Sequence, residues 1–285
     1  MSDSTLATLL VACPDRKGLV AALSQLLFDH GANILQSQQH TEPVEKMFFQ
    51  RIRFDISELD FPRDSLEDLL RSECARFEMR WSIHYDRTLQ RVAIFVSKFE
   101  HCLYDLLLRH RLGELRCEIP LIVSNHPDLS SVAEQFDVPY HVFPISQETK
   151  GEQEARQLEL LEQEGIDLVV LARYMQILSD SFVERFPQRI INIHHSTLPA
   201  FVGARPYHQA YERGVKLVGA TAHYASADLD DGPIIAQDVV PCSHRDTVAD
   251  LVRKGRDVER MVLASAVRCH LEDRIIAHGR RTVVF

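Results

Sequence analysis

The residues best suited to chemistry lie in the stretch Arg189–Gly203 and in the later stretch Asp228–Gly232. The first begins as an apolar run and opens into a polar turn that contains Asn192 and His194. An amide can donate a hydrogen bond, and an imidazole can donate to or polarise a carbonyl oxygen. Asp230 adds a carboxylate that could orient the imidazole or take a proton from water. Around one carbonyl carbon, these three groups would suit acyl transfer or hydrolysis.

Other polar residues of these stretches have plainer interpretations. Ser196 could be a nucleophile, but the sequence places no base and orienting partner for it, so we interpret it as a turn residue. His195 could shape a water site or cap the turn, and both interpretations stay open. The histidines show no H-x-x-x-H or H-E-x-x-H spacing, so no metal site is expected.

A parallel sheet is expected to position these groups. Short apolar runs predict strands at residues 92–96, 121–124, 141–143, 168–171 and 190–193. Helical stretches between them, such as 102–111, 131–136 and 152–164, indicate a doubly wound, mostly parallel α/β architecture. In such a sheet, side chains at the carboxyl ends of the strands converge on a crevice. Runs at 218–224 and 234–238 are predicted to extend the sheet, and the last helix to span about Arg245–His270.

The N-terminal part follows a different pattern. It predicts a strand at 5–13, a helix at 18–30, strands at 34–39 and 47–54, a helix from about Asp64 and a strand at 79–85. This βαββαβ order is the ferredoxin-like unit. A polar joint at Asp86 separates the two patterns, so the sequence predicts two domains, residues 1–86 and 87–285.

The composition is that of an ordinary globular chain, with 285 residues, 45% hydrophobic and 26% charged. A net charge of −9 without any basic block argues against nucleic acid or a membrane surface as a partner. Six scattered cysteines without C-x-x-C fit a reducing cytoplasm. Leu6–Cys13 is apolar but short and lacks a basic flank, so it indicates a strand, not a signal peptide.

Two motifs carry a family resemblance. N-I-H-x-S-x-L-P, which begins at Asn192, and the later His…D-x-D-x-G-P-I-I run, whose first aspartate is Asp228, resemble the signature of the formyltransferase family, whose members use 10-formyltetrahydrofolate. The family's catalytic Asn, His and Asp fall on Asn192, His194 and Asp230. The phrase HHSTLPAFVGARPYHQAYERGVK resembles the formyltetrahydrofolate deformylase branch more than the purine or initiator-tRNA transformylases.

The resemblance implies hydrolysis of 10-formyltetrahydrofolate to tetrahydrofolate and formate, with the folate as substrate and no further cofactor. That step would regulate one-carbon pools and supply formate for purine synthesis. In the family a loop after a central strand clasps the pterin, and it matches Leu171, Met175, Gln176, Ile177 and Leu178. From the residues alone, this segment could equally be a plain strand-to-helix loop.

Two alternatives remain. The first is formyl transfer to an amine, and the second is an amino-acid sensor whose catalytic domain is inactive. Transformylases that act on a phosphorylated purine precursor carry a Gly-rich loop after the first strand, where backbone N–H groups hold the phosphate. Ser97–Cys102 contains no glycine but does contain Phe99 and Glu100, which favours water as the acceptor.

The N-terminal domain also carries a resemblance. The D-R-x-G-L-V opening and the later G-A-N-I are similar to ACT domains, which bind amino acids or related effectors, usually at a subunit interface. This implies an effector site at Asp15, Gly18, Leu19, Asn33 and Ile34, an effector such as glycine or methionine, and a homo-oligomer. A purely structural or dimerising module is the alternative.

Overall fold

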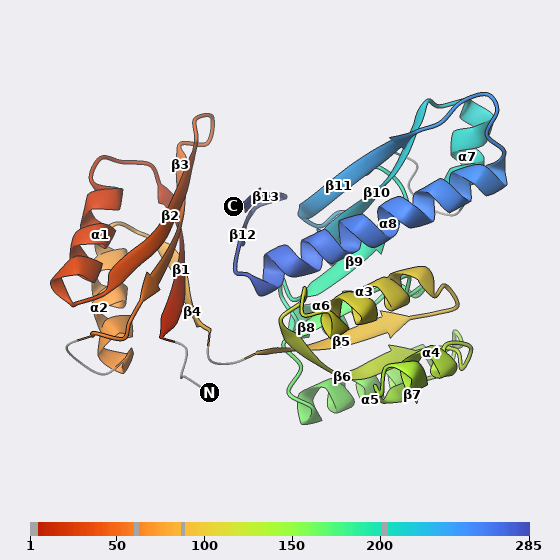
Figure 1. The fold of residues 1–285 in the computed structure, drawn as a ribbon, viewed down its shortest axis with the longest axis horizontal. Helices are drawn as coiled ribbons and strands as arrows, with labels where there is room; N and C mark the ends of the chain where they lie inside the picture. Colours follow the sequence, from red (N-terminus) through yellow and green to blue (C-terminus); the bar gives the residue numbers. More distant parts are fainter. Residues whose placement is uncertain (1–4, 60–62, 87–88, 201–204) are drawn as a thin grey trace. The chain divides into compact units, whose positions relative to one another are not determined.

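The computed structural model describes residues 5–59, 63–86, 89–200 and 205–285 (Figure 1). The chain divides into two compact units. Unit 1 comprises Met1–Leu89, Glu272–His278 and Val283–Phe285, and unit 2 comprises Gln90–Leu271 and Gly279–Thr282. The predicted domain boundary adjoins residues 87 and 88, which lie outside the described part of the chain.

Unit 1 has the predicted βαββαβ order. Its elements are β1 (Leu6–Pro14), α1 (Leu19–Asp29), β2 (Asn33–Glu42), β3 (Met47–Asp55), α2 (Arg63–Arg76) and β4 (Arg80–Tyr85). The sheet order is β2-β3-β1-β4, and the paired strands are antiparallel. This is the ferredoxin-like arrangement that the sequence predicts.

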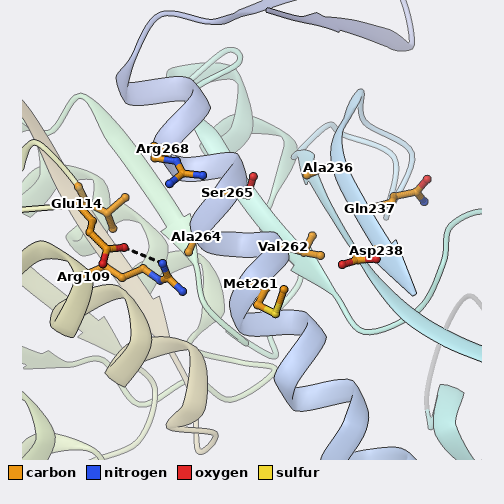
Figure 2. A pocket seen from close by; sticks show the side chains of 11 residues that line it. Arg109, Glu114, Ala236, Gln237, Asp238, Met261, Val262, Ala264, Ser265 and Arg268 are labelled. Carbon is orange, nitrogen blue, oxygen red and sulfur yellow. Dashed lines mark hydrogen bonds and ion pairs between the residues drawn. The ribbon is translucent and has the colours of Figure 1, made fainter. Parts of the chain in front are cut away.

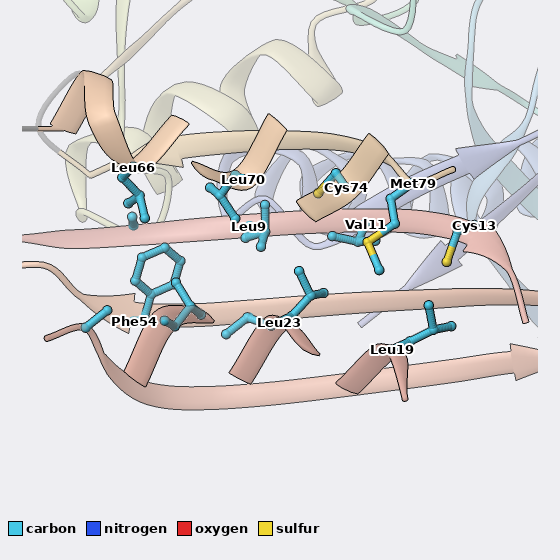
Figure 3. Close-up of a cluster of buried hydrophobic side chains, with 14 of the residues drawn as sticks. Leu9, Val11, Cys13, Leu19, Leu23, Phe54, Leu66, Leu70, Cys74 and Met79 are labelled. Atoms are coloured by element: carbon cyan, nitrogen blue, oxygen red, sulfur yellow. The ribbon is translucent and has the colours of Figure 1, made fainter. Parts of the chain in front are cut away.

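Both helices of unit 1 pack on one face of this sheet (Figure 3). Leu19, Leu23 and Leu27 recur every fourth residue, so they form one buried stripe on α1. A similar stripe on α2 includes Leu66 and Leu70. Burial of these stripes against the strands is the main force that stabilises the unit.

The C-terminal segment contributes to the other face. Ile276 joins Leu10, Ala12 and Phe49 in a second apolar cluster, so β1 is buried on both of its faces. Arg51 is only 4% exposed, and its guanidinium donates to the backbone oxygens of Glu272 at 3.0 Å and of Asp273 at 2.8 Å. Neither these contacts nor the two-stranded sheet of β12 (Ile275–His278) and β13 (Arg281–Val284) was predicted from the sequence.

Replacing Arg51 by methionine is expected to lower the free energy of unfolding of unit 1 by about 1.5–3 kcal/mol, because the hydrogen bonds of its charged, buried guanidinium are lost. Arg71→Met is the matched control, since the Arg71 side chain is 69% exposed on α2 of the same unit. Urea titration of both variants measures the difference. Equal losses of stability in the two variants would show that the Arg51 hydrogen bonds to Glu272 and Asp273 do not stabilise unit 1.

Unit 2 contains a sheet of seven strands, in the order β11-β10-β9-β8-β5-β6-β7. The strands are β5 (Gln90–Val96), β6 (Cys117–Ser124), β7 (Tyr140–Val142), β8 (Leu168–Leu171), β9 (Ile190–His194), β10 (Leu217–Tyr224) and β11 (Ile234–Pro241). The five strands from β5 to β9 run parallel, while β10 and β11 extend the sheet as antiparallel neighbours. The mostly parallel α/β prediction is confirmed.

Helices cover both faces of this sheet, as doubly wound folds require. They are α3 (His101–Arg111), α4 (Ser130–Gln135), α5 (Lys150–Gln163), α6 (Asp180–Arg185), α7 (Pro206–Arg213) and α8 (Val248–Leu271). Leu161 of α5 and Phe182 of α6 pack under the central strands, while α8 packs against α3, β9, β10 and β11 (Figure 1). Among the described residues, no helix is both long and apolar enough to cross a membrane.

The last helix begins three residues later than the sequence predicts. The Thr247 hydroxyl accepts from the backbone N–H of Asp250, and the Asp250 carboxylate accepts from the backbone N–H of Thr247. This reciprocal pair is a capping box, which satisfies N–H groups that an α-helix leaves unpaired at its start. The cap therefore fixes Val248 as the first residue of α8.

Candidate active site

The carboxyl ends of three neighbouring strands meet where the sequence predicts the site. Phe95 of β5 lies opposite Leu171 of β8, and Leu171 lies opposite Asn192 of β9. All three strands are parallel, so the segments that follow them leave the same edge of the sheet. The start of the predicted substrate loop therefore lies beside the carboxyl end of β9, which carries the predicted catalytic residues Asn192 and His194.

Asn192 and His194 are two residues apart on β9, so their side chains project to the same face. The antiparallel neighbour β10 places His223 directly opposite Asn192. Cross-strand partners on one face lie close enough for their side chains to interact. Asn192 Nδ2 lies 3.1 Å from His223 Nε2.

The predicted imidazole and carboxylate form a buried pair. His194 Nδ1 lies 3.0 Å from Asp230 Oδ2, and the two side chains are 6% and 8% exposed. The other carboxylate oxygen, Oδ1, lies 3.6 Å from His223 Nε2. His194 Nε2 is buried and has no hydrogen-bond partner among the described residues. The pair thus leaves one imidazole nitrogen available to a reacting molecule.

Electrostatics keep the Asp230 carboxylate ionised. Burial alone would raise the pKa of this carboxyl group, but its interactions with His194 and His223 outweigh burial and hold the pKa well below its usual range. The backbone supports the position, since Asp230 has a φ of 56° and Gly232 packs closely against Tyr224. A Cβ at Gly232 would lie 1.7 Å from the Tyr224 oxygen, so this turn requires glycine.

His223 also belongs to the site, although it was not among the site residues predicted from the sequence. Its Nδ1 lies 2.9 Å from the Tyr224 backbone oxygen and donates to it, while its Nε2 faces both Asn192 Nδ2 at 3.1 Å and Asp230 Oδ1 at 3.6 Å. His223 thereby connects Asn192 to Asp230. Its position as a polar residue within the apolar run 218–224 was the available signal.

A second buried cluster surrounds Glu259 of α8, which is 1% exposed. The hydroxyl of Tyr207 donates to Glu259 Oε1 at 2.6 Å, and His101 Nε2 lies 2.8 Å from Oε2. Arg173 Nη1 lies 3.4 Å from the same Oε2, and this side chain is 8% exposed. A single buried charge is costly, so the opposite charges of Arg173 and Glu259 offset part of each other's cost of burial.

The cluster does not suit a metal ion, although His101, Cys102 and Glu259 offer ligand atoms within 4.8 Å of one another. A thiol must ionise to bind a metal. Burial, followed by the charge of Glu259, raises the pKa of the Cys102 thiol well above its ordinary value. The adjacent Arg173 cation would also repel a metal ion.

His195 lies between the two clusters. Its ring centroid is 5.2 Å from that of His194 and 5.9 Å from that of Tyr207. Burial and the positive charge of Arg173 lower the pKa of His195 to about 3, with a smaller contribution from His194, while Glu259 and Asp230 oppose the shift. His195 is therefore a neutral imidazole at physiological pH.

This shift has a consequence for acid stability. A His195 side chain whose pKa is about 3 in the folded state and about 6.5 in the unfolded chain takes up its proton on unfolding between those pH values. The wild-type protein should therefore lose stability as the pH falls from 6.5 towards 3, and His195→Asn should lose less, by up to about 1.4 kcal/mol per pH unit. Denaturant titrations of both proteins at pH 7 and pH 5, with His244→Asn as the exposed control, measure this slope. Parallel slopes would contradict a neutral buried His195.

The predicted substrate loop follows β8. Leu171 is buried, Gln176 and Leu178 are half-buried, and the apolar side chains of Met175 and Ile177 are exposed. The Met175 N–H donates to the Ser97 hydroxyl at 3.0 Å, which ties the loop to the end of β5. Exposed apolar groups on an anchored loop fit a flat aromatic ligand.

The turn after β5 contains Phe99, the side chain that the sequence predicts would crowd a phosphate. The Phe99 ring lies beneath the guanidinium of Arg173, 4.8 Å from its centroid, and Arg256 lies 5.7 Å from the same centroid. These cation–π contacts hold the Phe99 ring in the turn, which contains no glycine that would let the backbone approach a phosphate closely.

The predicted effector residues lie at opposite ends of the unit 1 sheet, because Pro14 pairs with Met47 whereas Asn33 pairs with Asp55. Asp15 is exposed between β1 and α1, and Gly18 precedes the first residue of α1 in a left-handed conformation with φ 94°. Leu19 is buried in the core, so its side chain is not available to a ligand. Asn33 is exposed at the start of β2, and Ile34 packs partly against the core.

A pocket of about 340 Å³ lies elsewhere in unit 2, among α3, β11 and α8 (Figure 2). It is lined in part by Arg109, whose charge is balanced by Asp105 at 2.7 Å and Glu114 at 2.8 Å. None of the predicted catalytic or substrate-binding residues lines it. The reactive groups around His194 therefore define the candidate site.

An amide, a neutral imidazole and a buried imidazole–carboxylate pair on an α/β sheet define the class of enzymes that act on a carbonyl carbon. Residues 90–267 match the formyl transferase family, and residues 7–69 match the ACT domain. The chain is 54% identical to a formyltetrahydrofolate deformylase of Synechocystis sp. and 50% identical to one of Bacillus subtilis. These matches cover 98% and 97% of this chain, and 98% and 93% of the relatives.

A crystal structure of a formyltetrahydrofolate deformylase from Pseudomonas syringae pv. tomato superimposes with a TM-score of 0.95 at 45% identity, and the match covers 98% of this chain and 94% of that one. The chain belongs to the formyltetrahydrofolate deformylase branch of the formyl transferase family.

Proposed function

We infer that this chain hydrolyses 10-formyltetrahydrofolate to tetrahydrofolate and formate. The observation that carries this function is the buried His194–Asp230 pair beside Asn192, in a chain similar over its whole length to proteins named formyltetrahydrofolate deformylase. Roles for the individual residues follow from their geometry and are proposed on that basis.

His194 acts as the base that receives a proton from water, because its Nδ1 is held by Asp230 and its buried Nε2 has no partner in the described chain. Both Asp230 oxygens face imidazoles, which favours the orienting role for this carboxylate over direct contact with water. Asn192 donates to the formyl oxygen as negative charge develops there. His223 fixes the Asn192 amide.

The bonds balance in two steps. The water oxygen bonds to the formyl carbon while one water proton moves to His194 Nε2. The bond between that carbon and N10 of the folate then breaks, N10 receives the proton from His194, and formic acid ionises to formate. No covalent intermediate on the protein is required. Ser196 suits a structural role, because its hydroxyl donates to the backbone oxygen of Ala200 at 2.8 Å.

The loop with Met175 and Ile177 supplies apolar contacts to the pterin, together with Leu171, Gln176 and Leu178. Support comes from the exposure of these two apolar side chains beside the end of β9. No cofactor takes part besides the folate substrate.

Purified protein incubated with 10-formyltetrahydrofolate alone tests the function. Stoichiometric tetrahydrofolate and formate without any added amine are expected. Glycinamide ribonucleotide added to the same assay should neither accept the formyl group nor inhibit, because Ser97–Cys102 lacks the glycines that let a backbone approach a phosphate closely. Formylated ribonucleotide without formate would support the transformylase alternative, and binding of amino acids without any turnover would support the inactive sensor.

We propose further that unit 1 senses an amino acid linked to one-carbon metabolism, such as glycine or methionine, in a homo-oligomer whose subunits share the effector site. The match of residues 7–69 to the ACT domain supports ligand binding by this unit. In this proposal Asp15 accepts from the ammonium of the effector, and the backbone at Gly18 and Leu19, at the start of α1, receives its carboxylate. Asn33 and Ile34 of a neighbouring subunit complete the site, because within one chain they lie at the other end of the sheet. Such control would restrain loss of a folate that purine synthesis needs in the cytoplasm.

Either glycine or methionine is therefore expected to change the apparent affinity for 10-formyltetrahydrofolate by about 5–150-fold, the usual range of allosteric coupling. In Gly18→Asp, a carboxylate at the start of α1 should repel the effector, and the response should disappear. Gly18→Asn is the matched control, since it places a side chain of similar shape without the charge. Initial rates over a dose series of each amino acid measure the response. Unresponsive wild-type protein that binds neither amino acid would contradict this regulation.

A further inference from the structure

We propose that His194 and His195 hold the attacking water between their rings, so that His195 is a further catalytic residue. The inference rests on the hydrolytic function proposed above. The sequence leaves two roles open for His195, a water site or a turn cap, and the proposal selects the water site.

The geometry of the two adjacent histidines carries the proposal. The ring centroids lie 5.2 Å apart and the ring planes are tilted by 48°, a separation at which one water molecule can reach a nitrogen of each ring. His194 is 5% exposed, and its Nε2 has no hydrogen-bond partner among the described residues. In the described part of the chain, His195 makes ring contacts with His194 and Tyr207 but no hydrogen bond.

The Glu259 cluster holds His195 in place. Tyr207 contacts the His195 ring at 5.9 Å between centroids, and its hydroxyl is fixed to Glu259 at 2.6 Å. Arg173, which pairs with Glu259, adds a positive charge near His195. A cation at this place keeps the imidazole neutral, and only a neutral imidazole has a nitrogen that accepts from water.

Each histidine then has a separate task. His194, bound to Asp230, takes the first water proton. His195 accepts a hydrogen bond from the second O–H, which directs the oxygen lone pair at the formyl carbon. That second hydrogen stays on the oxygen until formic acid ionises and is then lost to solvent. Misplacement of a reacting group by about 1 Å can cost on the order of 100-fold in rate.

Competition between water and a stronger nucleophile tests the assignment. His195→Ala, His195→Asn, His194→Ala and the exposed control His244→Ala are assayed for formate release, and separately with hydroxylamine, which takes the formyl group as formohydroxamate and releases tetrahydrofolate. Hydroxylamine needs less assistance than water, because it attacks as a neutral amine. Formate release by wild-type protein tests the function itself and is read first.

His195→Ala is expected to lose on the order of 100-fold in kcat for formate release with little change in KM. It should keep most of its hydroxylamine-dependent transfer, whereas His194→Ala loses both reactions. His195→Asn, which retains one side-chain acceptor, should recover part of the formate release, and it decides the question if His195→Ala does not fold. Formate release by His195→Ala close to that of His244→Ala would overturn the proposal, as would an equal loss of both reactions.

Discussion

Replacement of Asp230 by asparagine is expected to lower kcat for formate release by about 100–10,000-fold, the usual contribution of general acid–base catalysis. The amide cannot hold a charged imidazole at His194, because Asn lacks the negative charge that lies 3.0 Å from Nδ1. Tetrahydrofolate binding should change little, since the proposed pterin contacts come from the loop with Met175 and Ile177 and not from Asp230.

Steady-state rates together with equilibrium binding of tetrahydrofolate separate these two effects. Asp228→Asn is the matched control, because Asp228 is an exposed carboxylate in the same loop. The control should keep nearly full turnover. Near-normal turnover in Asp230→Asn would show that the charge of Asp230 is not needed for catalysis. Equal losses in both variants would show that any negative charge in this loop, and not the His194–Asp230 pair, supports turnover.

The second large effect is expected at Asn192. Asn192→Ala should lower kcat by about 100–1000-fold, the range found when one donor to a developing oxyanion is removed. The loss should appear in kcat more than in KM, because the oxygen of the transition state carries more negative charge than the oxygen of the substrate. Loss of the amide also leaves His223 Nε2 without the partner that lies 3.1 Å away.

That structural side effect calls for a control at His223. His223→Gln retains a side-chain amide that can contact Asn192, and it should cost much less than Asn192→Ala. Pre-steady-state formate release by both variants isolates the chemical step from product release. An Asn192→Ala variant that forms formate at the wild-type rate in a single turnover would remove Asn192 from the catalytic assignment.

The fold was largely predictable, because its elements have strong local signals. Leu19, Leu23 and Leu27 recur at helical spacing, and Ile190–Ile193 is apolar enough for a buried parallel strand. The hydrogen bonds from Arg51 to Glu272 and Asp273 were not predictable, since they join residues more than two hundred positions apart in the sequence. The start of α8 was missed although Thr247 and Asp250 have the spacing of a capping box, which the sequence alone shows.

The candidate site was likewise predictable only in part. Asn192 and His194 share a strand, and Asp230 belongs to a recognisable motif, so sequence reasoning could name all three. His223 joins them through the antiparallel register of β10 against β9, whereas the local sequence marks it only as a polar residue in an apolar run. The Glu259 cluster draws His101, Arg173 and Tyr207 from three separate segments, so only the folded chain reveals it.

Hydrolysis in water enriched with oxygen-18 tests the central claim most directly, because it identifies the nucleophile. If water attacks the formyl carbon of 10-formyltetrahydrofolate, mass spectrometry will find one labelled oxygen in each formate released by the wild-type protein. Label should appear at a strongly reduced rate with Asp230→Asn and His194→Ala, and at the normal rate with Asp228→Asn. Formate without the label, or formyl transfer that proceeds only when an amine is supplied, would contradict the account.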